Sequence, residues 1–419
     1  MNQDRVDSLA QFHPFTRLNK LLENVQPGGG NTPLLLSPPL ILSLGEPQFQ
    51  PPAFALDAIA AARDSWSKYP PTLGNAAFRD AVTAWLGRRY GIESAFIDAE
   101  RMIVPVSGTR EALFHIALSA VAHGAPKGKG KVLMGNPFYH TYAGAAVVAG
   151  GTPAFLPAGP ETGFLPDPGA VPPALLDLAA LVYLCSPANP QGAVGSVDFW
   201  RRWLNLARRH DFLIAADECY AEIYSAAPPP GALEAAQASG SCDNLLVFHS
   251  LSKRSSAPGL RSGFMAGDAR YIARQAQLIN YGGVAVPLPV LAASTLLWSD
   301  EAHVVENRVR YQASFDLAQR ALGPIFGQVK PAGGFFLWLN VGDGEAAAVE
   351  LWRQAAIKVL PGGYMGRADE TGYNPGAAFI RVALVYEPAQ LAGAFGRMAP
   401  VLGSLGGLKE MPKISSRGR

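Results

Sequence analysis

The sequence is poor in cysteine. Only three of its 419 residues are cysteines, and no two of them form a CxxC pair. An odd number of cysteines without pair spacing excludes a disulfide framework and is typical of a reducing compartment, so we expect a cytoplasmic protein. No set of His, Cys and Asp residues has the spacing of a metal site. The sequence therefore predicts neither disulfides nor a bound metal.

Charge is also scarce. Charged residues make up 16% of the chain and sum to a net charge of +2, without long blocks of one sign. This balance excludes the basic patch of a nucleic-acid-binding protein. The N-terminus, MNQDRVDSLA, lacks a signal pattern, and no apolar run approaches the ~20 residues that a membrane-spanning helix needs. We expect a small-molecule partner, no nucleic acid and no membrane.

Apolar residues are abundant, at 49% of the chain. Such a composition supplies the surface that a folded core must bury. The length also exceeds the roughly 250–300 residues beyond which chains divide into domains. We predict an N-terminal arm at 1–50 that is part of the smaller domain, a large domain at 51–298, a small domain at 299–410 and a loose tail at 411–419.

Helical and strand patterns alternate in the large domain. The apolar periodicity predicts helices at 54–66, 75–90 and 109–122. Short strands are predicted at MIVPVS, KVLMG, AAVVAG, TPAFL, ALVYLC, FLIAAD, LLVFHS and SGFMAGD. Strands separated by helices indicate an α/β fold whose mostly parallel central sheet is flanked by helices. Helices at 301–323 and 346–357, with GGFFLWLNV and FIRVALV, predict the smaller α+β domain.

Polar residues follow several of these strands. Ligands of such sheets bind beyond the carboxyl ends of the strands, so these residues are the candidates for a site. SGTREAL opens a helix directly after MIVPVS, and the backbone N–H groups of Gly108, Thr109 and Arg110 would face a bound anion there. Taken alone, this motif is more simply an ordinary helix N-cap.

Three residues at the next strand ends each allow two interpretations. Asp217 ends the apolar run FLIAA, where it is either a helix cap or the counter-charge that keeps a pyridine nitrogen protonated. Asn189 of NPQG forms either a turn or a donor to a ligand oxygen. Tyr220, three positions after Asp217, is either a core residue or a second contact to the same ligand.

Lys253 lies in the segment SLSKRSSAPGLRSGF, directly after the strand LLVFHS. A solvated surface lysine would leave its neighbours Ser250, Ser252 and Arg261 unexplained, because hydroxyls and a guanidinium suit a phosphate. Together the strand ends define one ligand that has an anion, a ring nitrogen, a ring oxygen and a carbonyl that a lysine can attack. Pyridoxal phosphate has all four groups.

The motifs SGT, NPxG, D-E-x-Y, SLSK with its trailing Arg261, and FIRVALV follow one another between about residues 40 and 400. In this order they resemble the motifs of class I/II aminotransferases, which are fold type I pyridoxal-phosphate enzymes. The resemblance implies the large and small domains of that fold, pyridoxal 5′-phosphate as cofactor, an amino acid and a 2-oxo acid as substrates, and a homodimer with shared active sites.

The resemblance also implies a role for each matching residue. Lys253 would be the catalytic residue that bonds covalently to the cofactor, and Asp217 would pair with its ring nitrogen. Asn189 and Tyr220 would bond the ring hydroxyl, while Tyr139 of NPFYHTY would stack on the ring. The phosphate end of the cofactor would be held by Gly108, Thr109, Arg110, Ser250, Ser252 and Arg261.

Three further residues acquire a role in the same way. Tyr69 of YPPTLG resembles the tyrosine that reaches the cofactor phosphate of the neighbouring subunit. Arg381 of FIRVALV would clamp the α-carboxylate of the substrate, with Asn189 and with Gly45 of SLGEP close to the substrate.

The subgroup follows from longer segments. SLSKRSSAPGLRSGFMAGD, LPGGYMGR, NPGAAFIRVALV and HPFTRLNKLL are most similar to those of N-succinyldiaminopimelate aminotransferases of lysine biosynthesis. The reaction implied is amino transfer between N-succinyl-LL-2,6-diaminopimelate and 2-oxoglutarate. Both substrates carry acidic groups beyond the α-carboxylate, so a second cation is needed, and Arg110, Lys68 and Arg254 are the candidates. An aspartate or aromatic aminotransferase is the alternative.

Two other functional classes share the cofactor site. A ligand-sensing transcription regulator needs an attached DNA-binding region, and the arm at 1–50 is too short and uncharged for one. A lyase or racemase is compatible with Arg381 and the complete lysine motif, and only product analysis separates it from an aminotransferase.

Overall fold

The computed structural model of the protein describes residues 13–28 and 38–405. The tail predicted at 411–419 lies outside these residues. The main helices are α2 (Pro14–Leu22), α3 (Ala53–Ala61), α4 (Ala76–Tyr90), α6 (Thr109–Gly124), α7 (His140–Val148), α9 (Val197–His210), α10 (Ala232–Ala238), α11 (Leu251–Arg254), α12 (Ala269–Gly282), α13 (Leu288–Ser299), α14 (Ala302–Phe326), α15 (Gly344–Ala355) and α16 (Pro388–Ser404). The strands are β1 (Leu40–Ile41), β2 (Ile103–Val106), β3 (Lys131–Asn136), β4 (Thr152–Pro157), β5 (Ala179–Cys185), β6 (Leu213–Asp217), β7 (Leu245–Ser250), β8 (Gly263–Gly267), β9 (Phe336–Asn340), β10 (Ile357–Lys358), β11 (Leu360–Pro361) and β12 (Phe379–Ala383).

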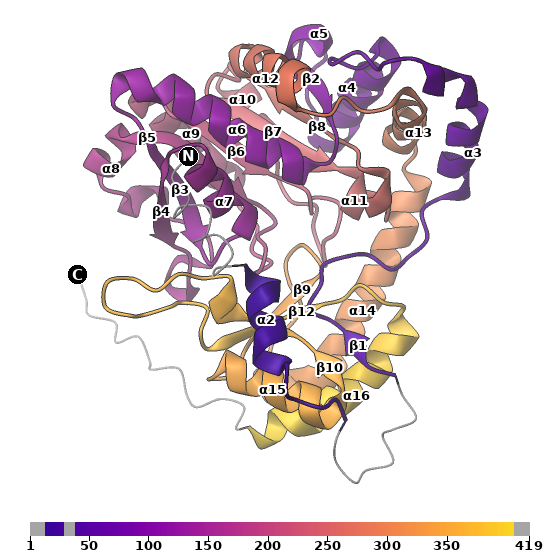
Figure 1. Cartoon of the computed structure of the whole chain (residues 1–419), viewed down its shortest axis with the longest axis vertical. Helices are drawn as coiled ribbons and strands as arrows, with labels where there is room; N and C mark the ends of the chain where they lie inside the picture. Colours follow the sequence, from indigo (N-terminus) through magenta and orange to yellow (C-terminus); the bar gives the residue numbers. More distant parts are fainter. Residues whose placement is uncertain (1–12, 29–37, 406–419) are drawn as a thin grey trace.

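The largest sheet has seven strands in the order β2-β8-β7-β6-β5-β3-β4. Neighbouring strands are parallel except where β8 pairs with β2 and with β7. Helices α4, α9, α10 and α13 share a hydrophobic cluster with one face of this sheet, and α6, α7 and α12 share another with the opposite face (Figure 1). The predicted α/β fold with a mostly parallel sheet is therefore confirmed. The central strands β5, β6 and β7 are almost wholly apolar because both of their faces are buried, whereas the edge strand β4 is partly exposed.

A smaller part of the molecule lies below this sheet in Figure 1. Its hydrophobic cluster joins α14, α15 and α16 to a three-stranded antiparallel sheet of order β11-β12-β9. Helix α2 packs here through Leu18 and Leu22, which share a hydrophobic cluster with Leu360, and β1 pairs with β10. The N-terminal segments therefore attach to the smaller part.

Two local predictions were wrong. The run AAVVAG at 145–150 was expected to be a strand, but most of it is the end of helix α7. A short apolar run fits either structure by periodicity alone, and its alanines favour the helix. The helix expected at 54–66 divides at Ala62 into α3 and a 3₁₀ turn, Arg63–Ser67.

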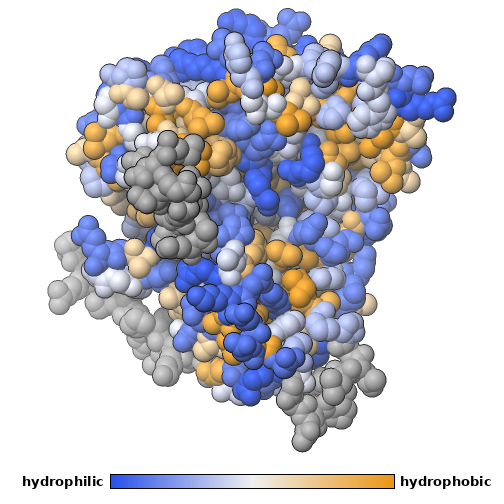
Figure 2. Space-filling view, in the orientation of Figure 1, coloured by the Kyte–Doolittle hydropathy of each residue, from blue (hydrophilic) through white to orange (hydrophobic). Residues whose placement is uncertain are grey.

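The surface of the face seen in Figure 1 mixes hydrophilic and hydrophobic residues. Hydrophilic residues gather in the centre of its upper half, with hydrophobic patches on either side (Figure 2). No helix among residues 13–28 and 38–405 is long and apolar enough to cross a membrane. In the same part of the chain, no group of three or more His, Cys, Asp or Glu residues could hold a metal ion.

Candidate active site

A cavity of about 540 Å³ lies at the carboxyl ends of the parallel strands. Both parts of the molecule form its walls, because Lys253 follows β7 of the large sheet while Arg381 lies on β12 of the small one. The predicted site residues that line it are Gly45, Thr109, Arg110, Tyr139, Asn189, Asp217, Tyr220, Ser250, Ser252, Lys253, Arg261 and Arg381. Residues that follow neighbouring parallel strands meet at one edge of the sheet, which explains this gathering.

Lys253 lies on α11, a single helical turn that directly follows β7. Its amine donates a hydrogen bond to the backbone oxygen of Gly45 and lies 5.2 Å from the centre of the Phe335 ring. Burial lowers the pKa of Lys253 from 10.5 to about 8. Roughly one amine in ten is then uncharged at pH 7, and the uncharged amine is the nucleophile.

Asp217 ends strand β6 and is 4% exposed. Its carboxylate accepts a hydrogen bond of 2.5 Å from the hydroxyl of Tyr142 and one of 3.3 Å from the backbone N–H of Cys219. The ring of Tyr142 stacks on that of Tyr183, with centres 4.3 Å apart. Burial raises the pKa of Asp217, while the hydrogen bonds it accepts oppose that rise. A carboxylate held in such surroundings attracts a cationic partner.

The start of α6 and Arg261 form a site for an anion. Gly108 has a φ of 84°, and a Cβ at this position would overlap the guanidinium of Arg261. Only glycine therefore lets the helix start approach this arginine. Gly108 itself is buried and does not line the cavity, while the hydroxyl-bearing Ser250 and Ser252 line it together with Arg261. The expected contribution of the Gly108 N–H is wrong, because this group donates to the backbone oxygen of Val106 at 2.7 Å. The other N–H groups of the helix start, a guanidinium and hydroxyls are donors that hold a phosphate.

Arg381 faces the cavity from β12 and is 4% exposed. Its terminal nitrogens donate to the side-chain oxygen of Asn189 at 2.8 Å and to the backbone oxygen of Ser43 at 2.7 Å. Its guanidinium lies 4.2 Å from the centre of the Phe336 ring. Burial lowers the pKa of Arg381 to about 10, so the group stays charged at neutral pH. An arginine fixed in this way suits bidentate binding of a carboxylate.

Arg110 and Tyr139 form a second polar pair on the cavity wall. The Nε of Arg110 donates to the hydroxyl of Tyr139 at 2.6 Å. Its terminal nitrogens have no hydrogen-bond partner among the residues that the structure describes. The neighbouring His140 is uncharged, because burial lowers its pKa to about 3. Arg110 is therefore an exposed cation that one bond holds in place.

Comparison with known proteins identifies the family. The family model for aminotransferase class I and II matches residues 37–395. The chain belongs to the class I and II aminotransferases. This confirms the resemblance seen in the sequence motifs, and with it the aminotransferase activity and the cofactor, pyridoxal phosphate.

Relatives match this aminotransferase over most of its length. A solved aminotransferase from Neisseria meningitidis is 38% identical, with a TM-score of 0.86 over 93% of this chain and 97% of that chain. The 4-dedimethylamino-4-oxo-anhydrotetracycline transaminase OxyQ of Streptomyces rimosus is 35% identical over 85% of this chain and 92% of its own. The LL-diaminopimelate aminotransferase of Desulforudis audaxviator is 28% identical over 93% and 95%.

The residues of the cavity fit pyridoxal phosphate. The contact between Gly108 and Arg261 leaves the start of α6 and a guanidinium facing the same space, which suits the phosphate. The buried carboxylate of Asp217 suits a protonated ring nitrogen. The amine of Lys253, which reaches the same cavity, suits the aldehyde.

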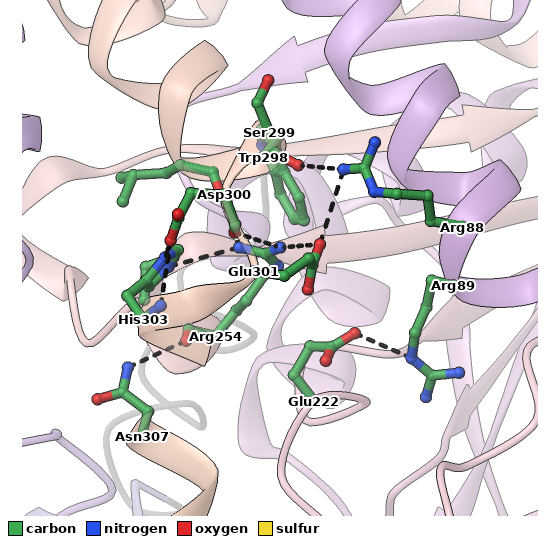
Figure 3. A network of polar contacts seen from close by, with 12 residues as sticks. Arg88, Arg89, Glu222, Arg254, Trp298, Ser299, Asp300, Glu301, His303 and Asn307 are labelled. Carbon is green, nitrogen blue, oxygen red and sulfur yellow. Dashed lines mark hydrogen bonds and ion pairs between the residues drawn. The ribbon is translucent and has the colours of Figure 1, made fainter. Parts of the chain in front are cut away.

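Besides Gly108, three residues named from the sequence do not line the cavity. Tyr69 is 100% exposed and Lys68 is exposed, and neither lines the cavity. As a candidate for the second cation of the pocket, Arg254 is wrong: it is 2% exposed and its guanidinium bonds Glu301 in the network of Figure 3. Consecutive side chains on a helical turn diverge by about 100°, so Lys253 reaches the cavity while Arg254 points away from it.

The sequence did not single out several residues of the cavity. Tyr142 contacts Asp217 from α7, three positions after Tyr139, and that helical spacing was the signal that could have found it. Cys219 also lines the cavity, with its sulfur 3.0 Å from the hydroxyl of Thr109. Burial raises the pKa of the Cys219 thiol well above its ordinary value. No spacing pattern around Cys219 in the sequence indicated that it lines the cavity.

Proposed function

We propose that this aminotransferase transfers an amino group between N-succinyl-LL-2,6-diaminopimelate and 2-oxoglutarate, in lysine and diaminopimelate biosynthesis. The observation that carries the proposal is that one cavity contains both the buried Arg381 and the exposed Arg110. Each substrate has an α-carboxylate and at least one further acidic group, so each needs two cations. The diaminopimelate aminotransferase of Desulforudis audaxviator supports a substrate of this type.

Arg110 is the second cation in this proposal. Lys68 does not line the cavity and Arg254 is bonded elsewhere, which leaves Arg110 from the three candidates. Its bond to Tyr139 restricts the side chain while its terminal nitrogens stay available. Such preorganisation reduces the entropy that is lost when a distal carboxylate binds.

Pyridoxal phosphate supplies an aldehyde that exchanges amines and a ring that accepts the electron pair released at the substrate Cα. In our assignment Lys253 would hold the cofactor covalently, and its free amine would take the proton from the substrate Cα. A pKa of about 8 suits a base that works near neutral pH. The carboxylate of Asp217 would balance the charge of the ring nitrogen, and Asn189 and Tyr220 would bond the ring hydroxyl.

The backbone at 43–45 accepts hydrogen bonds from both Arg381 and Lys253. Arg381 donates to the oxygen of Ser43, and Lys253 donates to the oxygen of Gly45. A substrate whose α-carboxylate is bound by Arg381 therefore has its Cα on the side of the Lys253 amine, which is the orientation that proton transfer needs. Gly45 leaves this space open, because a Cβ there would come within 2.6 Å of the Phe336 ring.

We further propose a cytoplasmic homodimer in which Tyr69 completes the site of the partner subunit. Tyr69 is 100% exposed, and the nearby Trp66 and Leu56 are 57% and 58% exposed. Apolar surface of this kind marks an interaction site when several such residues lie together. Within each subunit, the proposed large domain is 51–298, and the small domain is 299–410 with the arm at 1–50.

The test is a panel of amino donors with 2-oxoglutarate as acceptor, in which glutamate formation is followed. The donors are N-succinyl-LL-diaminopimelate, LL-diaminopimelate, aspartate and phenylalanine. We expect the succinylated donor to have the highest kcat/KM. A bulky cyclic ketone belongs among the acceptors, because the Streptomyces rimosus relative is named as the transaminase of one.

Arg110→Gln makes the test specific. Losing one ion pair to a distal carboxylate costs about 2–3 kcal/mol, so kcat/KM for the succinylated donor should fall on the order of 100-fold. The value for phenylalanine should change little, and the matched variant Lys68→Gln should behave as the wild type. Activity on aspartate or phenylalanine alone contradicts the proposal in favour of an aspartate or aromatic aminotransferase. Products without glutamate point to a lyase or racemase.

A further inference from the structure

The helical turn that carries Lys253 is short. Helix α11 has four residues, and isolated helices of this length are not stable in water. Ser250 caps its start by accepting a hydrogen bond of 3.1 Å from the backbone N–H of Ser252. Leu251 is completely buried, and Ser256, just after the turn, has a φ of 49°. The position of Lys253 therefore depends on the contacts of the residues around it.

Arg254, the next residue, holds the turn against another segment. Its guanidinium donates to the backbone oxygens of Leu297 at 2.6 Å and Asp300 at 3.2 Å. It also donates to the carboxylate of Glu301 at 2.7 Å and lies 5.1 Å from the centre of the Trp298 ring. All four residues belong to the end of α13 and its connection to α14 (Figure 3).

The first turns of α14 hold the same segment from a second direction. The Nε2 of His303 is 2.9 Å from the hydroxyl of Ser255, and its Nδ1 is 2.5 Å from Asp300. The amide of Asn307 donates to the backbone oxygen of Arg254 at 3.2 Å. Helix α14 runs from this point to α16 in the smaller part of the molecule (Figure 1). The turn with Lys253 is thus attached to the start of the helix that joins the two parts.

We propose that Arg254 is a positioning residue, which keeps the amine of Lys253 buried in the cavity by holding α11 against the α13–α14 connection. The inference rests on the assignment of Lys253 as the reacting lysine and is independent of which amino donor the enzyme uses. The planar guanidinium reaches its three acceptors from two separate terminal nitrogens, whereas the three N–H donors of a lysine radiate from a single atom. Arg254 is 2% exposed, so these acceptors replace the water that would otherwise solvate its charge.

Burial of the Lys253 amine is a measurable consequence of this positioning. Desolvation is the main cause of its lowered pKa, and the charged and titratable groups that act on it are Cys219, Arg110, Arg381 and Glu46. If the turn loosens, the amine gains solvent and its pKa rises toward 10.5.

The experiment measures Lys253 directly in the cofactor-free protein. Trace acetylation with acetic anhydride over a series of pH values, with the Lys253 peptide quantified by mass spectrometry, gives the pKa of this amine without turnover. The variants are Arg254→Met, Arg254→Lys and Glu301→Gln. We expect the pKa to rise by about one unit or more in each variant, which leaves about tenfold less uncharged amine at pH 7.

The sign of the shift separates positioning from a direct charge effect. Loss of the negative charge of Glu301 would by itself lower the lysine pKa, and Arg254→Lys would by itself leave it unchanged. Thermal unfolding verifies that each variant is folded. The side chain of Glu301 is 42% exposed, so we expect Glu301→Gln to fold and to test the proposal even if Arg254→Met does not fold.

Arg308→Gln is the matched control. Arg308 also lies on α14 and bonds the buried Glu222 at 2.8 Å, but it has no hydrogen bond to α11 among the described residues. We expect a loss of thermal stability without a change in the Lys253 pKa. An equal shift in Arg308→Gln overturns the proposal, and so does a pKa within about 0.3 unit of the wild type in Arg254→Lys and Glu301→Gln.

Discussion

Replacing Tyr142 with phenylalanine removes a single hydroxyl next to Asp217. That hydroxyl donates a hydrogen bond of 2.5 Å to a carboxylate that is 4% exposed. The phenyl ring can keep the stack on Tyr183, whose centre lies 4.3 Å away. Tyr142→Phe therefore removes one hydrogen bond from the candidate site while preserving the packing around it.

The size of the effect follows from this bond. A hydrogen bond to a buried charged group contributes about 1.5–3 kcal/mol, so its loss raises the pKa of Asp217 by roughly 1–2 units. This adds to the rise that burial already causes. A carboxyl with a higher pKa takes up its proton at a higher pH, so the acid limb of the kcat profile moves upward by the same roughly 1–2 units. The KM of the amino donor should change little, because Arg381 is untouched.

The assay is the pH dependence of kcat at saturating substrates, with thermal unfolding measured alongside. Tyr183→Phe is the matched control, because Tyr183 is equally buried and its hydroxyl donates at 2.5 Å to the backbone oxygen of Leu113 instead. We expect this control to lose stability while its acid limb stays at the wild-type position. The reasoning is refuted if the Tyr142→Phe profile coincides with that of the wild type, or if both variants shift alike.

Three further predictions follow from the site. Lys253→Met should abolish amino transfer. It should also remove a pH dependence of unfolding in the cofactor-free protein. The pKa of Lys253 is about 8 in the native state and near 10.5 in the unfolded chain, so the free energy of unfolding of the wild type rises by at most about 3 kcal/mol between these pH values. Denaturant titrations at several pH values measure this rise. Gly108→Ala should weaken cofactor affinity by about tenfold or more in a spectroscopic titration, because its Cβ displaces Arg261. Gly91→Ala, with a φ of 66° and open space around the Cβ, controls for backbone strain and should bind normally. If sites are shared between subunits, mixing Tyr69→Phe and Lys253→Met subunits should restore about one quarter of wild-type activity, because half of the dimers are mixed and each mixed dimer has one intact site. Failure to restore any activity contradicts the proposed dimer.

The strand ends show how much could be predicted from the sequence. Asp217, Asn189 and Lys253 are far apart along the chain, yet each follows a buried apolar strand, and parallel strands place such residues at one edge of a sheet. The cavity lining confirms that they meet. The run AAVVAG was assigned wrongly because periodicity over a few apolar residues does not distinguish a strand from the end of a helix.

Arg254 shows the limit of that reasoning. The two residues before it, Ser252 and Lys253, line the cavity, and only the direction in which the Arg254 side chain leaves the α11 turn sends it to Glu301. Helical spacing from Tyr139 indicates the side of α7 on which Tyr142 lies, but only the folded structure shows that its hydroxyl meets Asp217 at the end of β6. Contacts of this kind depend on how separate elements pack, and a local pattern does not contain that information.

The sequence by itself determined most of the strands and helices, the cofactor motifs at the strand ends and the family, because these depend on local periodicity and on residues at fixed spacing. The tertiary structure alone decided which of the three candidates for the second cation faces the cavity. Arg110 and Arg381 reach it from different parts of the molecule, Arg254 is buried behind it, and Lys68 lies outside it. Side-chain direction and the packing of distant segments set these positions, and both arise only when the chain has folded.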